Sequence, residues 1–376
     1  MVKSKRDIII KKYLEQHSLV ESNILSFNDF INHRLQEIVN DLNNNLSNEE
    51  VEIKLGKARV GKPNIIEADG SSSLVSPGIA RLRNLTYSAP VFVELTVKYA
   101  GQTDSAEVEI GRMPIMVKSS VCSIAVMSKE ELIENYMDKL DPGGYFIVNG
   151  NERIMVMSED LAANQPFIEE GRQGLTLRLF SQRGAYRIPT TISETNDGIL
   201  ELTFSRLKNI PLIPLLKSLG MIKEMDIAKF IDHETDSLIV NMYEYANIQS
   251  TDDALMFIAE RAGIQGTKKE IIDRIKERID SFLLPHIGSD KNARNEKAQT
   301  LCRLIRLYLR SKENEEIRTD KDHYANKRVK LSGDLLSDLF RVNLGILVRD
   351  IQYSLQKISK RKKFYSLKTI AKSTLF

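Results

Sequence analysis

Cysteine is scarce in this sequence, with only Cys122 and Cys302 among 376 residues. Two cysteines so far apart give neither a disulfide framework nor a closely spaced pair of thiolates for zinc. The five histidines are equally scattered and no two have metal-ligand spacing, so we expect no metal site in this chain. This sparse thiol content is typical of a reducing cytoplasm, which is the predicted location.

Long apolar runs are also missing. The longest purely apolar run, Ile210–Leu216, contains two prolines, whereas a membrane-spanning helix needs about 20 apolar residues. At the N-terminus, charged residues surround only three consecutive isoleucines, whereas a secretory signal needs an apolar segment of about 7–15 residues. Neither membrane insertion nor secretion is therefore expected.

A strong excess of one charge is absent as well, because 54 Lys and Arg stand against 51 Asp and Glu, a net charge of +3. This balance excludes a histone-like polycation and an acidic tail protein. The average hides an asymmetry, since residues 320–376 carry 13 basic and 5 acidic residues, or +8, which leaves −5 for residues 1–319. The basic charge is thus concentrated at one end of the chain.

The order of apolar patterns predicts an α+β protein of two mixed α/β domains. Regions with helical spacing of apolar residues and regions with period-two alternation are segregated along the chain, and no βαβ rhythm is present. Two β-rich regions are each followed by helices. The predicted helices are 7–43, several within 211–286, 296–310 and 333–358, and the β-rich regions are 51–110, 145–157 and 171–204.

Three helix starts are predicted from capping residues. Ser26, with Asp29 three positions later, is suited to cap the second N-terminal helix. Ser128 with Glu131 and Thr267 with Glu270 are capping boxes, in which each side chain bonds the backbone of the other residue.

The most glycine-rich stretch is Asp141–Gly150. A phosphate-binding loop would need such glycines just before a helix, whereas an apolar strand pattern follows here. We therefore predict a hairpin in which Asn149-Gly150 joins a strand at Tyr145–Val148 to a strand at Ile154–Met157.

Basic and aromatic residues are interleaved where Arg178, Arg183 and Arg187 flank Phe180 and Tyr186. This pattern suits a nucleic-acid surface, and it equally suits a hairpin with one solvated face. Both interpretations stay open.

The densest polar cluster is Asp320–Lys330, in which Lys327, Arg328 and Lys330 could contact a phosphate backbone. A solvated, self-paired charged loop is the favoured interpretation. A catalytic Asp322–His323 pair is disfavoured, because adjacent side chains rarely point at one target and no nucleophile accompanies them. His323 is predicted to be structural. Lys360–Lys363 could contact successive phosphates of a nucleic acid, or could stabilise the C-terminal end of a helix by interacting with its dipole.

Six stretches together resemble the N-terminal part of the second-largest (B, or beta-like) subunit of multisubunit DNA-directed RNA polymerase, in its compact archaeal form. Each stretch is weakly specific alone, but they occur in the family's order and span nearly the whole chain. They are Ser26–Ile31, Ala80–Pro90, Ile110–Met116, Gly143–Arg153, Leu284–Ile287 and Asp320–Arg328.

The resemblance implies a discontinuous protrusion domain at 1–171 and 325–376, with an inserted lobe domain at 172–324. It implies that the chain ends before the fork region, as a split or truncated subunit. No residue here would be catalytic and no cofactor would bind this chain, because the largest subunit holds the Mg²⁺ of the assembled polymerase.

The resemblance further implies one wall of the DNA cleft and a docking surface for transcription factors, in a nucleoid-associated enzyme. Partners would be the largest subunit, the rest of the second-largest subunit, template DNA and basal factors. The DNA-facing candidates are Arg183, Arg187, Lys327, Arg328 and Lys330. The alternative is a non-catalytic interaction scaffold with only incidental DNA contact.

Overall fold

The computed structural model describes residues 5–43, 51–67, 69–99, 102–171, 174–184, 186–233 and 235–361. The chain divides into two compact units. Unit 1 comprises Met1–Ser158 and Val329–Phe376, and unit 2 comprises Glu159–Arg328. Both units combine helices with antiparallel sheets, which confirms the predicted α+β class.

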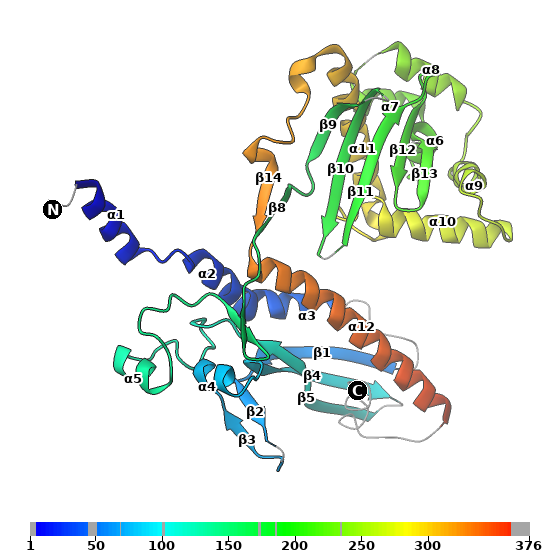
Figure 1. Cartoon of the computed structure of the whole chain (residues 1–376). Helices are drawn as coiled ribbons and strands as arrows, with labels where there is room; N and C mark the ends of the chain where they lie inside the picture. Colours follow the sequence, from blue (N-terminus) through cyan, green and yellow to red (C-terminus); the bar gives the residue numbers. More distant parts are fainter. Residues whose placement is uncertain are drawn as a thin grey trace. The chain divides into compact units, whose positions relative to one another are not determined.

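Unit 1 is built on a three-stranded antiparallel sheet in the order β1-β4-β5 (Figure 1). Two small hairpins, β2-β3 and β6-β7, accompany it. Its elements are α1 (Lys5–Gln16), α2 (Glu21–Asp29), the π-helical turn η1 (Phe30–Arg34), α3 (Leu35–Asn43), β1 (Val51–Val60), β2 (Asn64–Ile66), β3 (Ser72–Leu74), α4 (Pro77–Leu82), β4 (Ser88–Tyr99), β5 (Gln102–Pro114), α5 (Lys129–Glu134), β6 (Phe146–Val148), β7 (Asn151–Arg153) and α12 (Ser332–Arg361).

The core of unit 1 lies between this sheet and α12. Along β4 every second residue is buried, from Val91 to Val97, because successive side chains of a strand point to opposite faces. Leu344, Val348 and Ile351 of α12 are buried in the same cluster. Helix and sheet side chains line a small apolar cavity of about 20 Å³. The returning helix therefore completes the core that the first segment begins.

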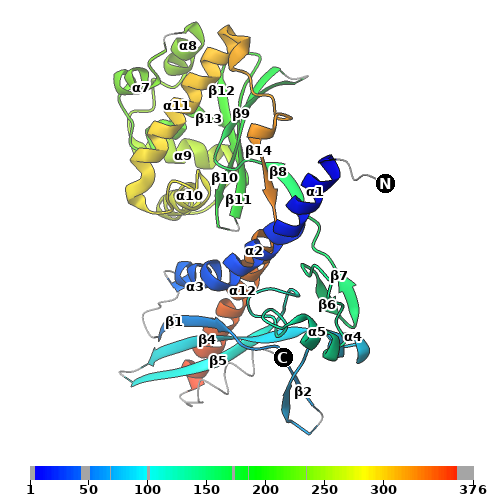
Figure 2. The same ribbon diagram turned by 90° about the vertical axis from the view of Figure 1, so that its left-hand side faces the viewer.

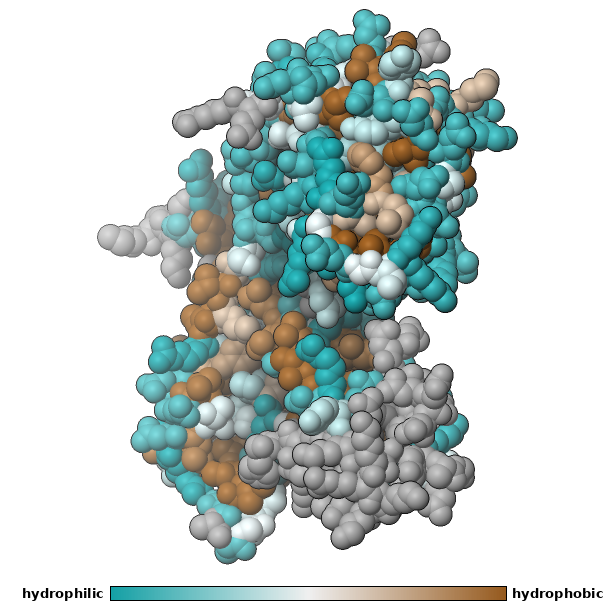
Figure 3. Space-filling model, turned by 90° about the vertical axis from the view of Figure 1, so that its right-hand side faces the viewer, coloured by the Kyte–Doolittle hydropathy of each residue, from teal (hydrophilic) through white to brown (hydrophobic). Residues whose placement is uncertain are grey.

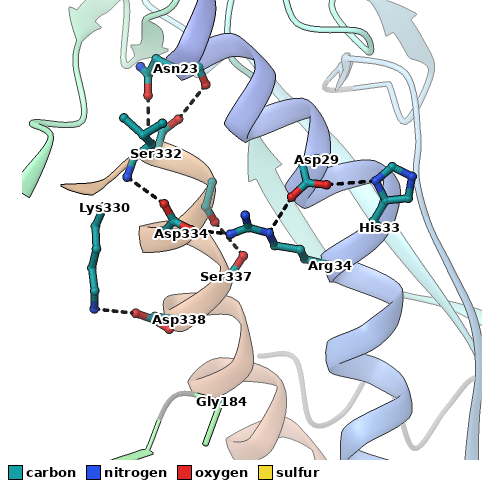
Figure 4. Close-up of polar contacts among 12 residues, drawn as sticks. Asn23, Asp29, His33, Arg34, Gly184, Lys330, Ser332, Asp334, Ser337 and Asp338 are labelled. Atoms are coloured by element: carbon teal, nitrogen blue, oxygen red, sulfur yellow. Dashed lines mark hydrogen bonds and ion pairs between the residues drawn. The ribbon is translucent and has the colours of Figure 1, made fainter. Parts of the chain in front are cut away.

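A polar network fixes the start of α12 to the N-terminal helices (Figure 4). Arg34 donates to Asp29 at 2.6 Å and to Asp334 at 2.5 Å, which joins residues 300 positions apart. The hydrogen bond to Asp334 raises the pKa of Arg34. The Ser332 hydroxyl donates to the carbonyl oxygen of Asn23 at 3.2 Å. These contacts set the register of α12 on α2 and η1.

The predicted cap at Ser26 is wrong, since α2 begins at Glu21 and Ser26 lies inside it. Because α2 already begins at Glu21, the N–H groups that follow Ser26 lie in the helix interior and need no cap. Helix α12 packs closely against the backbone here, since a Cβ added to Gly333 of α12 would lie 2.0 Å from the carbonyl oxygen of Ser26. Both predicted capping boxes are confirmed, at Ser128 with Glu131 and at Thr267 with Glu270.

The Asn149-Gly150 turn is confirmed, with both residues in the left-handed region at φ 50° and 75°. The predicted partner strand at 154–157 is wrong. Because the turn has only two residues, Val148 pairs with Asn151, and the second strand occupies 151–153 instead. Residues 154–157 follow β7 without belonging to any strand.

Unit 2 is a meander, because its five strands follow the order β13-β12-β11-β10-β9 and each pairs antiparallel with its neighbours in sequence. Its elements are β9 (Pro166–Gly171), β10 (Gly174–Arg183), β11 (Tyr186–Glu194), β12 (Leu200–Phe204), β13 (Leu207–Pro211), α6 (Leu212–Ser218), α7 (Glu224–Ile231), α8 (Asp236–Glu244), α9 (Thr251–Arg261), α10 (Lys268–Phe282), α11 (Arg294–Glu313) and the 3₁₀ turns η2 (Lys291–Ala293), η3 (Glu315–Ile317) and η4 (Tyr324–Asn326).

Helices α7 to α11 gather on one face of this sheet (Figure 2). Leu177 and Leu179 of β10 are buried on that face, together with Leu301 and Ile305 of α11. The alternation at Leu175, Leu177 and Leu179 therefore predicted the strand correctly. Gly220, with φ 108°, follows the last residues of α6, as its position in the sequence predicts.

The division between the units falls inside β8 (Ser158–Leu161) and β14 (Lys327–Lys330), which pair in a two-stranded sheet. β9 belongs to unit 2 because it pairs with β10. Among the described helices, none combines the length and apolar character that crossing a membrane requires.

Candidate nucleic-acid interface

The β10–β11 hairpin carries Arg183 and Arg187 on opposite faces of the sheet. Arg187 pairs with Gln182, and Arg183 pairs with Tyr186. Paired residues share a face whereas consecutive residues alternate, so Arg183 lies on the face of Ser181 and Arg187 on the face of Gln182. The hairpin thus does not gather its two candidates into one basic patch.

Arg187 is held within unit 2 by three contacts. Its guanidinium forms an ion pair with Asp160 and donates to the carbonyl oxygen of Leu161 at 3.0 Å. It also stacks over the ring of Phe180, with 4.5 Å from its central carbon to the ring centroid. Its charge is balanced by Asp160, and its side chain is only 21% exposed.

Arg183 is exposed and lies beside the loop that follows α10. It donates to the hydroxyl of Ser289 at 3.3 Å. On the same face, Ser181 and the Nδ1 atom of His286 lie 2.7 Å apart. His286 and the fully buried Leu284, whose φ is 45°, belong to the motif Leu284–Ile287. That motif shapes the loop under Arg183.

Lys297 of α11 is fully buried beneath this loop. Its ammonium group donates to the carbonyl oxygen of Asp280 at 2.6 Å, near the C-terminal end of α10. Burial lowers the pKa of Lys297 to about 8, and the positive charges of Arg294 and Arg183 act in the same direction. Burial lowers the pKa of His286, and the positive charge of Lys297 lowers it further. Arg183 therefore lies near a second cation, Lys297, beside the carboxylates of Asp280 and Asp290.

The polar cluster 320–330 is a self-bonded turn followed by a strand. The Nδ1 atom of His323 accepts a hydrogen bond from the N–H of Ala325 at 3.1 Å, which confirms its predicted structural role. Asn326 donates to the carbonyl oxygen of Asp320 at 2.6 Å and accepts from Gln165 at 2.9 Å. These bonds stabilise the turn at the point where β14 begins.

Lys327 and Lys330 are ion-paired. Lys327 lies 2.8 Å from Glu159, which raises its pKa, and Lys330 lies 3.4 Å from Asp338 (Figure 4). Arg328 is exposed and, among the residues that the structure describes, donates to the carbonyl oxygens of Ala325 and Lys327 alone, at 2.9 and 2.7 Å. Within the described ranges, neither Arg328 nor Arg183 has a carboxylate partner, so these two keep their charge available for an anion.

Metal binding and covalent catalysis have no suitable grouping of side chains among the described residues. In the part of the chain that the structure describes, no three His, Cys, Asp or Glu side chains are grouped so as to hold a metal ion. Both cysteines are buried and free, and burial raises the pKa of Cys302 to about 12. A thiol of that kind is a poor nucleophile at neutral pH.

The sequence of the chain matches the model of a family described as "RNA polymerase beta subunit" over residues 18–375. The chain therefore belongs to this family. It is 35% identical to "DNA-directed RNA polymerase subunit Rpo2N" of Halobacterium salinarum, with 99% of this chain and 76% of that protein covered. For the Rpo2N protein of Methanocaldococcus jannaschii the identity is 36%, with 98% and 77% covered.

Identity to "DNA-directed RNA polymerase subunit Rpo2" of Saccharolobus solfataricus is 37%, over 97% of this chain but only 33% of that protein. The chain thus spans about a third of such relatives. The predicted resemblance to the N-terminal part of the archaeal second-largest subunit is confirmed.

Proposed function

We propose that this chain is the N-terminal portion of the second-largest subunit of a DNA-directed RNA polymerase and forms one wall of its DNA cleft. The observation that carries the proposal is the match to the Rpo2N protein of Halobacterium salinarum, which covers 99% of this chain and 76% of that protein. Partners would be the largest subunit, the remainder of the second-largest subunit, template DNA and basal factors, in a nucleoid-associated cytoplasmic enzyme.

In this proposal unit 1 is the protrusion and unit 2 is the lobe. The division of the chain supports the assignment, because unit 1 is made of two segments that flank a single inserted segment. The strand pair β8-β14 then marks where the chain enters and leaves the lobe.

DNA contact in such a wall requires positive charge that is not neutralised within the protein, since phosphate binding is electrostatic and independent of sequence. Of the five candidates, Arg183 and Arg328 meet this condition best. Arg187, Lys327 and Lys330 are paired with carboxylates and would reach DNA only by exchanging those partners.

No residue of this chain is assigned to the chemical step of RNA synthesis. Magnesium would be held by the largest subunit, and the described residues do not offer a donor set for it. The isolated chain is therefore expected to synthesise no RNA.

Reconstitution tests the proposal. Added to the remaining subunits of the polymerase, the chain should co-elute with them and be required for DNA-templated RNA synthesis. Elution as a separate species, with synthesis undiminished in its absence, would rule the proposal out.

A scaffold that docks subunits or factors, with incidental DNA contact, is the second candidate. The ion pairing of three of the five basic candidates favours it. Charge reversal at Arg183 and Arg328 separates the two functions. DNA retention by the reconstituted enzyme should fall if this chain lines the cleft, and should be unchanged if it is only a scaffold.

A further inference from the structure

Residues 154–157 form an apolar stretch on unit 1 that pairs with no strand in the part of the chain that the structure describes. Ile154, Val156 and Met157 are 74%, 81% and 58% exposed, whereas Met155 packs against the core of unit 1. Two of the four side chains are β-branched, a type enriched in strands. Such a stretch at the surface of a protein is an aggregation hazard unless something covers it.

The stretch lies between two strands that are paired. β7 ends at Arg153 and pairs with β6, and β8 begins at Ser158 and pairs with β14. Among the described residues, no backbone hydrogen bond joins 154–157 to another segment. Figure 2 shows the chain running from β7 to β8 through this stretch. Strand pairing is thus present on both sides of 154–157 and absent over it.

The edge of β1, another strand of unit 1, is bonded by side chains of a neighbouring helix. At the edge of β1, the side-chain amide of Asn43 exchanges two hydrogen bonds of 2.6 Å with the backbone of Leu55. Gln36 accepts from the N–H of Ala58 at 2.8 Å and donates to the carbonyl oxygen of Gly56 at 3.2 Å. Side chains of α3 thus bond the free edge of β1, whereas no described side chain does so for the backbone of 154–157.

Other apolar side chains reach the surface, including Leu339 and Val342 of α12, and brown patches interrupt the teal surface in Figure 3. Those two residues lie on a helix, whose backbone hydrogen bonds are made internally. A partner that supplies both apolar side chains and backbone groups would cover 154–157 and replace water on its backbone groups.

We infer that 154–157 is a docking edge for a β-strand from the part of the second-largest subunit that this chain does not match. We assign the docking strand to the rest of the subunit because relatives of the single-chain type carry about two thirds of their sequence outside the region that this chain matches. The inference rests on the proposed function. The added strand would pair with the backbone of 154–157 and cover Ile154 and Val156, as in other β-strand additions.

Amide hydrogen exchange of the chain alone and in the reconstituted polymerase tests this inference. The amides of 154–157 should exchange rapidly in the isolated chain and about a hundredfold more slowly after assembly. Unchanged exchange in an assembled enzyme would overturn the inference and leave the proposed function intact. Failure of the chain to assemble would overturn both.

Proline substitutions provide a second test of the inference. Successive N–H groups of a strand point to opposite edges, so Val156→Pro and Met157→Pro each remove a donor from a different edge. One of the two should lower incorporation into the polymerase about tenfold, whereas Val156→Thr, which keeps the N–H and the branched side chain, should not. The melting temperature of the isolated variants shows whether they fold. Normal incorporation of both folded proline variants would contradict the inference.

Discussion

Unit 1 and unit 2 differ in how far apart in sequence their contacts lie. Unit 2 is a meander in which each strand pairs with the next, so its sheet is made of local contacts. Unit 1 needs α12, which returns after the whole of unit 2, and the ion pair between Arg34 and Asp334 spans 300 positions. Closing so long a loop is entropically unfavourable. Unit 1 is therefore the part of the molecule that depends on a few precise long-range contacts.

The first prediction tests the close contact that the start of α12 makes with α2. Gly333→Ala should destabilise unit 1 by about 2–3 kcal/mol, because its Cβ would meet the carbonyl oxygen of Ser26 at 2.0 Å. Gly345→Ala is the matched control on the same helix. Nothing lies within 4 Å of its added Cβ, so it should stabilise by up to about 1 kcal/mol.

Urea unfolding followed by far-ultraviolet circular dichroism measures both glycine variants, since the protein has no tryptophan to serve as a fluorescent probe. Amide exchange resolves which unit is affected. Equal stability of the two variants would contradict the close packing of α12 against α2.

The second prediction concerns the stability of the two units at acidic pH. Hydrogen bonds and ion pairs lower the pKa values of Asp29, Glu67 and Glu107 in unit 1, whereas Glu270 has a lowered pKa in unit 2. A carboxylate with a depressed pKa contributes stability above its unfolded pKa, and that contribution is lost as the pH falls through the folded pKa. Unit 1 should therefore lose more stability than unit 2 between about pH 5 and 3.

Amide exchange at several acidic pH values compares the two units directly. Asp29→Asn should flatten the response of unit 1, because it removes one of the titrating groups. Earlier opening of unit 2 than of unit 1 would show that the carboxylates of unit 1 do not control its acid stability.

A third, smaller effect is expected on the alkaline side in unit 2. Burial lowers the pKa of Lys297 to about 8 in the folded chain, from an ordinary value of 10.5. The unfolded state binds more protons between these values, so unit 2 should gain stability from pH 8 to about 9.5, below the range where tyrosines ionise. Lys297→Met should abolish the gain. A gain of the same size in that variant would assign it to another group.

Local signals predicted local structure well. Ser128 with Glu131 formed a capping box as predicted, because every atom involved lies within one helical turn. The predicted cap at Ser26 was wrong because the helix extends back to Glu21, so Ser26 lies inside it. The turn at Asn149-Gly150 was predictable, but the extent of its second strand was not, since residues 154–157 carry the apolar pattern of a strand yet belong to none.

The candidate site likewise has features that the sequence predicts and features that only the fold shows. Basic residues near 183–187 and 327–330 could be read from the sequence, and alternation along a strand places Arg183 and Arg187 on opposite faces. The partners that neutralise Arg187 and Lys327 could not be read, because Asp160 and Glu159 lie far away in sequence. The motif Leu284–Ile287 was visible, yet its neighbours Ser181 and Lys297 become apparent only in the fold.

The most direct test of the cleft-wall account is the salt dependence of DNA retention by the reconstituted polymerase. Each phosphate contact contributes about 0.9 to the slope of log affinity against log salt concentration. The double substitution Arg183→Gln and Arg328→Gln should therefore reduce that slope by about 2, whereas Lys208→Gln, which removes an exposed charge from β13, should leave it nearly unchanged. A double variant with the slope of the unmodified enzyme would contradict the claim that these two arginines face DNA.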